Sequence, residues 1–143
     1  MSYWTDGKEL DTSRQGWLES LGRACDWTVD VSMMTSQESP YGEDSSFVHR
    51  GEYADWRGSF RGEYAAATRA WDVFCPIWHG GQGVKALVMA APFLEAQTDA
   101  PDCMEAARRG AAFILRNQVP EGEPEAGLIR AYEGGSPSVN TSA

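Results

Sequence analysis

Residues 98–116, TDAPDCMEAARRGAAFILR, decide the fold because they form the best-defined helix in the chain. Thr98 or Asp99 can cap this helix, and Pro101 suits its first turn, where a missing backbone N–H leaves no hydrogen bond unmade. Charged side chains follow the helix dipole, with acids first and arginines later: Asp102, Glu105, Arg108, Arg109 and Arg116. Helical spacing predicts a buried apolar stripe: Met104, Ala107, Ala111, Ile114 and Leu115.

The stretch before this helix, residues 71–83, reads WDVFCPIWHGGQG and is dense in aromatic residues and glycine. Because proline disrupts the hydrogen bonds of a helix interior and glycine disfavours the helix, we expect Pro76 and the three glycines to interrupt helical geometry. An apolar helical stripe resumes at Val84 and is expected to kink or end at Pro92. A second helix is therefore predicted over about residues 84–94.

Towards the N-terminus, apolar spacing predicts a helix from about Ser13 to Met33, followed by a long aromatic-rich connection over residues 35–62. Long connections of this kind tend to be functional, and the aromatics suggest that this one packs over another part of the molecule. A short helix is predicted from Glu63 to about Val73. Because no segment alternates apolar and polar residues as a strand does, the predicted fold class is all-α.

Composition narrows the classes of partner. The chain has 143 residues, of which 42% are hydrophobic, as expected for one folded unit. Its 12 basic and 21 acidic residues give a net charge of -9, which opposes binding to nucleic acid or to anionic membranes. We find neither a long apolar span nor a signal-like start, so a soluble, cytoplasmic protein is expected. Three scattered cysteines suggest neither disulfides nor a metal site, and no cofactor is expected.

The candidate binding site centres on residues 78–83. Glycine lets a backbone approach a ligand closely, and a helix N-terminus offers unpaired N–H groups to ligand oxygens. Trp78 offers a face for a sugar ring, His79 is a candidate proton donor, and Gln82 is a polar contact. The alternative is that the glycines form a tight turn, Trp78 fills the core and His79 is structural.

Candidate catalytic carboxylates lie on both sides of this region. Asp72 is a candidate general acid if its aromatic neighbours desolvate it and raise its pKa. A glycosidase needs a second carboxyl group, and Glu52, Asp55 and Glu63 are candidates for that role. Glu52 is also a candidate substrate contact. Trp71 and Tyr53 are the aromatic residues expected to contact substrate beside them. The alternative is a solvated acidic surface.

Residues 78–90, WHGGQGVKALVMA, and 106–118, AARRGAAFILRNQ, together with the glycine-rich connection that follows, resemble a helical hairpin of the six-hairpin glycosidase-like superfamily. The resemblance covers about residues 70–133. It implies an (α/α)6 toroid and a carbohydrate ligand. It extends to glycoside hydrolases, polysaccharide lyases and sugar epimerases, and unsaturated glucuronyl hydrolases are among the members.

Length limits this interpretation. Twelve helices of about 15 residues need roughly 180 helical residues, more than the chain contains. Residues 1–143 are therefore expected to be a single α-helical unit, the N-terminal part of a larger toroid, whose uncovered apolar faces predict self-association. Two hypotheses follow: part of a carbohydrate-active enzyme, in which Trp78 and His79 face a pocket, or a non-catalytic α-helical interaction module, in which they are enclosed by apolar side chains.

Overall fold

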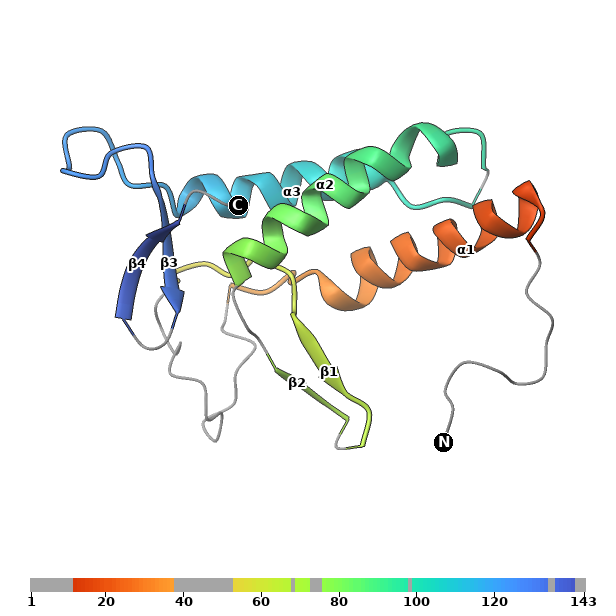
Figure 1. Ribbon diagram of the computed structural model, residues 1–143, viewed down its shortest axis with the longest axis horizontal. Helices are drawn as coiled ribbons and strands as arrows, with labels where there is room; N and C mark the ends of the chain where they lie inside the picture. Colours follow the sequence, from red (N-terminus) through yellow and green to blue (C-terminus); the bar gives the residue numbers. More distant parts are fainter. Residues whose placement is uncertain are drawn as a thin grey trace.

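The computed structural model describes residues 12–37, 53–67, 69–72, 76–97, 99–133 and 136–140. The described part is mostly helical, as the sequence predicts, with two small β-hairpins added (Figure 1). In chain order the elements are α1 (Arg14–Trp27), the π-helical segment η1 (Thr28–Ser32), β1 (Glu63–Ala65), β2 (Ala70–Asp72), α2 (Pro76–Leu94), α3 (Cys103–Arg116), β3 (Ile129–Glu133) and β4 (Ser136–Asn140).

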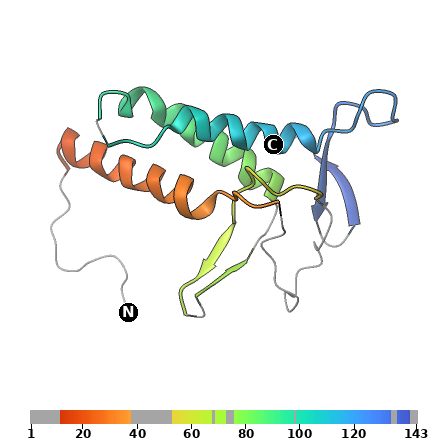
Figure 2. The same cartoon turned by 180° about the vertical axis from the view of Figure 1, so that it is seen from behind.

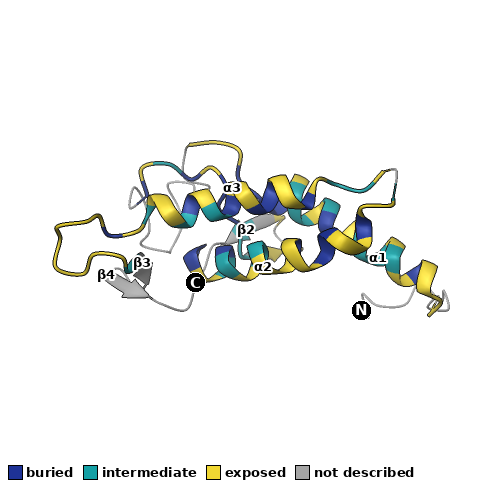
Figure 3. Cartoon of the chain, turned by 90° about the horizontal axis from the view of Figure 1, so that it is seen from above, coloured by how far each residue is buried: buried dark blue, intermediate teal, exposed yellow. Residues whose placement is uncertain are grey.

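The three α-helices form the body of the structure. Helices α2 and α3 lie side by side as a helical hairpin, and α1 runs along the same pair and contacts α2 (Figures 1 and 2). Each helix carries both buried and exposed positions, so one side of each helix faces the core (Figure 3). Among the helices that the described residues form, none has both the length and the apolar character that a membrane span requires.

Capping side chains define two of the helix starts. The Ser13 hydroxyl accepts a hydrogen bond from the Gly16 N–H at 3.1 Å and begins α1. The Asp102 carboxylate accepts one from the Glu105 N–H at 2.8 Å and begins α3. The predicted caps at Thr98 and Asp99 were therefore wrong. The N-cap residue of a helix usually has a short side chain that accepts a hydrogen bond. In α3 this residue is Asp102, which directly follows Pro101.

The predicted break at Pro76 and the glycines is also wrong, because α2 begins at Pro76 and continues through all three glycines. Proline is tolerated at the first helical position. A side chain at Gly83 would place its Cβ 2.9 Å from the Phe60 ring, and one at Gly110 of α3 would lie 2.6 Å from Val84. These glycines therefore let the two helices close around the Phe60 ring.

Helix α3 buries only part of the predicted stripe, in which Ala107 is buried. Met104 is 39% exposed and Leu115 is 63% exposed, although both were expected to be buried. The core-facing positions of α3 are Cys103, Ala106, Ala107, Gly110 and Phe113. The close approach of α2 selects small residues for the contact face, and hydrophobicity alone does not identify that face.

The predicted long connection packs over the helices, as expected, where the structure describes it. Residues 53–61 run antiparallel to residues 32–37, held by backbone hydrogen bonds between Gly58 N–H and Met34 C=O at 2.8 Å and between Met34 N–H and Ser59 C=O at 2.8 Å. Trp56 is 1% exposed and lies in an aromatic cluster with Phe113. Residues 53–60 of the connection therefore contribute to the core.

A β-hairpin replaces the helix that was predicted from Glu63 to Val73. Strands β1 and β2 pair antiparallel, and the hairpin projects from the helical body (Figure 1). Arg69, in the turn, has a φ of 54°, which a regular right-handed helix does not allow. Strands β3 and β4 form the second hairpin. The apolar spacing of residues 64–71 was therefore misread as helical.

Candidate functional site

Three aromatic rings from separate elements form a half-exposed cluster, which we call the aromatic platform: Trp27, Tyr64 and Trp71. The ring of Trp71 lies 5.4 Å from that of Trp27 and 5.1 Å from that of Tyr64. Trp27 is 48% exposed and Tyr64 is 47% exposed. The contacts of these two residues with Trp71 join the end of α1 to the β1–β2 hairpin and leave Trp27 and Tyr64 partly exposed to solvent.

Arg61 supplies a positive charge to the aromatic platform. Its guanidinium carbon lies 5.5 Å from the centre of the Trp71 ring, within cation–π range. The same guanidinium donates hydrogen bonds to the Met34 sulfur and to the Val31 carbonyl, each at 3.1 Å. Arg61 is therefore held in place by the residues that follow α1.

The β1–β2 register brings two predicted catalytic residues to facing positions. Glu63 pairs with Asp72, and Tyr64 pairs with Trp71 in the next position. Because successive residues of a strand alternate between its two faces, the Glu63–Asp72 pair and the Tyr64–Trp71 pair occupy opposite faces of the hairpin. The side chains of Glu63 and Asp72 lie outside the described part of the structure. Their catalytic role stays a prediction.

The predicted aromatic site residues of α2 contact each other and make no ring contact with the described aromatic platform. Trp78 is 43% exposed, its ring lies 5.1 Å from that of the half-buried His79, and Gln82 is exposed. Among the described residues, no ring contact joins Trp78 to the platform. Because residue 78 lies within the helix, Trp78 and His79 do not flank a glycine-rich ligand loop. Trp78 does not fill the core either.

Of the two remaining predicted substrate contacts, Tyr53 and Glu52, the structure describes only Tyr53. Tyr53 is 3% exposed, and its ring packs 4.9 Å from Trp56 and 5.3 Å from Phe113. Because its ring lies in the core, the structure gives Tyr53 a packing role and no open face for substrate. Glu52 lies outside the described residues.

Sequence reasoning missed Trp27, Tyr64 and Arg61 as members of one site. The repeated tetrapeptide Arg-Gly-Glu-Tyr at residues 50–53 and 61–64 marks two of them in the sequence. Its second copy enters β1, where Arg61 precedes the strand and Tyr64 lies within it. No local signal connects Trp27 to this segment, because tertiary packing brings them together.

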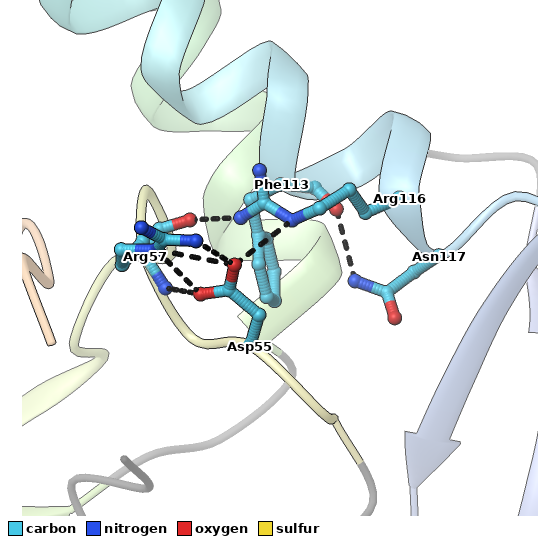
Figure 4. Close-up of polar contacts among 5 residues, drawn as sticks. All are labelled: Asp55, Arg57, Phe113, Arg116 and Asn117. Carbon is cyan, nitrogen blue, oxygen red and sulfur yellow. Dashed lines mark hydrogen bonds and ion pairs between the residues drawn. The ribbon is translucent and has the colours of Figure 1, made fainter. Parts of the chain in front are cut away.

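Asp55 anchors the 53–61 segment to the C-terminal part of α3. Arg57 donates to both Asp55 carboxylate oxygens, the closest at 2.7 Å, and Arg116 forms an ion pair with the same carboxylate at 3.7 Å (Figure 4). Arg116 also donates to the Arg57 carbonyl. The hydrogen bonds from Arg57 lower the pKa of Asp55 to about 2.

Replacing Asp55 with asparagine is expected to destabilise the protein by about 1 kcal/mol at pH 7, the upper range for a partly exposed ion pair. Because the native pKa of Asp55 is lowered, this stabilisation is present above pH 4 and is lost as the pH falls towards 2. Urea unfolding of both proteins between pH 7 and pH 2 measures the difference. Glu121→Gln, at an exposed position with no ion pair among the described residues, is the control. A pH-independent difference would contradict this role for Asp55.

The described cysteines show no nucleophilic site. Cys25 and Cys103 are buried in one apolar cluster. Burial, with the neighbouring Cys103, raises the pKa of Cys25 to about 12, so its thiol is protonated at neutral pH. No group of three or more metal-ligating side chains occurs in the described ranges.

Comparison of the chain with protein-family models, with curated proteins and with solved structures found no match. The functional argument therefore depends on the geometry of the described residues.

Proposed function

We propose that this chain is a carbohydrate-binding part of a glycoside hydrolase-like protein, and that the aromatic platform holds an acidic oligosaccharide. The observation that carries the proposal is the contact of the Trp71 ring with the half-exposed rings of Trp27 and Tyr64, with Arg61 over the Trp71 ring. Exposed aromatic residues in one group are uncommon on a folded surface unless they bind something.

The chemistry of the platform suits a sugar with a carboxylate. Aromatic rings offer large apolar faces at a low cost in conformational entropy, and the C–H faces of a sugar ring can stack on them. Arg61 adds a planar donor group that pairs with carboxylates. Because it is held at the edge of the platform by Met34 and Val31, it is positioned before a ligand binds.

The toroid interpretation is supported by the surface of α2. Helix α2 exposes several apolar side chains: Trp78, Val88, Met89 and Phe93. Helices in a larger (α/α) toroid would cover such a face, and the α2–α3 hairpin is the unit from which a toroid is built. The same exposed side chains favour the second candidate function, a non-catalytic helical interaction module.

Sedimentation analysis separates the two candidates when it is combined with a sugar titration. An interaction module is expected to associate through the exposed face of α2 and to show no response to oligosaccharides. The carbohydrate-binding chain is expected to respond to sugar in the monomeric or the associated state. The variant Met89→Gln, which makes the α2 face more polar, is expected to reduce association without changing sugar binding.

Replacing Trp71 with alanine is expected to weaken binding of a uronic-acid oligosaccharide at least tenfold, because the central ring of the platform is lost. Isothermal titration calorimetry measures the affinity. Trp71→Phe keeps an aromatic face and is expected to retain most of the affinity. Trp17→Ala, at a 63% exposed position on α1, is the matched control. Equal losses at residues 17 and 71, or no loss at residue 71, would contradict the proposal.

Arg61→Gln tests the acidic part of the ligand. This variant is expected to weaken binding of the uronic-acid oligosaccharide more than binding of its neutral counterpart, since the guanidinium contributes only where a carboxylate is present. A loss of equal size for both sugars would show that Arg61 supports the platform structurally and does not select an acidic sugar.

A further inference from the structure

We propose that a second site, separate from the aromatic platform, binds a doubly charged tetrahedral oxyanion such as a phosphate group or a free sulfate ion. The site is a hollow of about 250 Å³ between the 53–61 segment and α3, lined by three arginines, Arg57, Arg109 and Arg116, with Gly58 and Ala112 between them. We refer to it as the arginine hollow.

The charge of the hollow opposes that of the whole chain. The chain has only 12 basic residues against 21 acidic ones, yet three arginines converge here. Asp55 pairs with Arg57 and Arg116. Arg109 makes no ion pair within the described ranges. Three guanidinium groups and one carboxylate leave two net positive charges, which a dianion matches.

The spacing along α3 forms the hollow. Arg109 and Arg116 are seven residues apart in sequence, two helical turns, and therefore lie on the same side of the helix. Ala112 lies between them, and its small side chain leaves room for a ligand. Each guanidinium offers a planar set of donors that suits the oxygens of phosphate or sulfate.

The opposite wall of the hollow is fixed by close contacts. Gly58 lies so near the α3 backbone that a Cβ there would come within 2.2 Å of the Arg109 carbonyl oxygen. Asp55 holds the Arg57 guanidinium at both carboxylate oxygens, and Arg116 donates to the Arg57 carbonyl (Figure 4). Two of the three arginines are therefore positioned before a ligand arrives, which lowers the entropic cost of binding.

Titration with inorganic phosphate, inorganic sulfate and acetate, at constant ionic strength, tests the site. Backbone amide shifts in NMR spectra report where each anion binds. Phosphate and sulfate are expected to shift the amides of Gly58 and Arg109 with saturating curves, and acetate is expected to bind at least tenfold more weakly. Equal binding of acetate, or no saturable shift at these amides, would overturn the proposal.

Arg109→Gln is the decisive variant because the Arg109 side chain makes no hydrogen bond or ion pair among the described residues. It is expected to lower phosphate affinity at least tenfold with an unchanged melting temperature. Lys85→Gln, which removes an exposed cation of α2, and Trp71→Ala, in the aromatic platform, are expected to leave that affinity unchanged. Equal losses in Arg109→Gln and Lys85→Gln would show general charge attraction and overturn the site.

A second titration, with two sugar esters, identifies the kind of molecule that carries the anion. Glucose 6-phosphate and glucose 6-sulfate place the two groups on the same sugar, but at pH 7.5 the phosphate ester carries about two negative charges and the sulfate ester about one. Tighter binding of the doubly charged phosphate ester is expected and would indicate a phosphorylated ligand, whereas equal or tighter binding of the singly charged sulfate ester would overturn the match to a dianion. Binding of neither ester, in a protein that binds the free anions, would overturn a role in recognising such groups.

Discussion

Replacing Gly58 with alanine is expected to lower the free energy of unfolding by about 3 kcal/mol. Gly58 has a φ of +86°, where a side chain costs about 1–2 kcal/mol. Its Cβ would also lie 2.2 Å from the Arg109 carbonyl oxygen and 2.8 Å from the carbonyl carbon, so the segment would have to move away from α3. Overpacking of this kind costs about 1–3 kcal/mol more. Urea unfolding measures the total.

The variant Gly122→Ala separates the cost of backbone strain from the cost of the steric clash with α3. Gly122 has a similar φ of +96°, but a Cβ there meets no atom within 4 Å. It is expected to cost about 1 kcal/mol, from backbone strain alone. If Gly58→Ala and Gly122→Ala lower the free energy of unfolding by the same amount, the 53–61 segment does not contact α3 closely at Gly58. The description of the fixed wall of the arginine hollow would then be wrong as well.

Replacing Phe113 with alanine is expected to destabilise the protein by about 4 kcal/mol. The ring is completely buried and packs 5.3 Å from the Tyr53 ring and 6.4 Å from the Trp56 ring. Removing a buried phenylalanine loses the transfer free energy and leaves a cavity, with measured costs of about 3–5 kcal/mol in other proteins. Thermal and chemical unfolding give the value.

Leu115→Ala is the matched control, two residues further along the same helix. The apolar pattern of the sequence placed Leu115 in the buried stripe, whereas the structure leaves it 63% exposed. A change of about 0.5 kcal/mol or less is expected, as for other surface substitutions. If Leu115→Ala lowered the free energy of unfolding by more than about 2 kcal/mol, Leu115 would be buried, as the sequence pattern predicted, and the buried face of α3 described here would be wrong.

Helices α1 and α3 and the second half of α2 were predictable because each has a local signal in the sequence. Ser13 offers an N-cap for α1, and the charges of α3 follow the helix dipole. The buried face of α3 was not predictable from hydrophobicity. Close packing against α2 favours Ala106 and Gly110 at the contact and leaves larger apolar residues outside.

The glycine-rich run shows how tertiary packing overrides local preference. Three glycines and Pro76 argue against a helix when they are considered alone. In the fold, the glycine at position 83 accommodates the Phe60 ring, which lies in the core with Leu87. The energy gained from that packing offsets the weak helix propensity of the segment. The glycines of residues 78–83 indicate close helix packing, whereas the sequence pattern alone was interpreted as a candidate ligand loop or a tight turn.

The candidate site was predictable only in part. Trp71 was identified from its aromatic surroundings, but its partners Trp27 and Tyr64 come from a helix and a strand that the pattern did not connect. Strands of three residues are too short to show alternation, so the β1–β2 hairpin that aligns Tyr64 with Trp71 left no clear signal. The geometry of the site depends on tertiary contacts.

The central claim is that the aromatic platform binds carbohydrate, and tryptophan indole signals in NMR spectra test it most directly. During titration with a uronic-acid oligosaccharide, the indole N–H signals of Trp27 and Trp71 are expected to shift together and to saturate. The signals of Trp17, exposed elsewhere on α1, and of the buried Trp56 are expected to stay unchanged. No shift at Trp27 and Trp71, or equal shifts at Trp17, would contradict the claim.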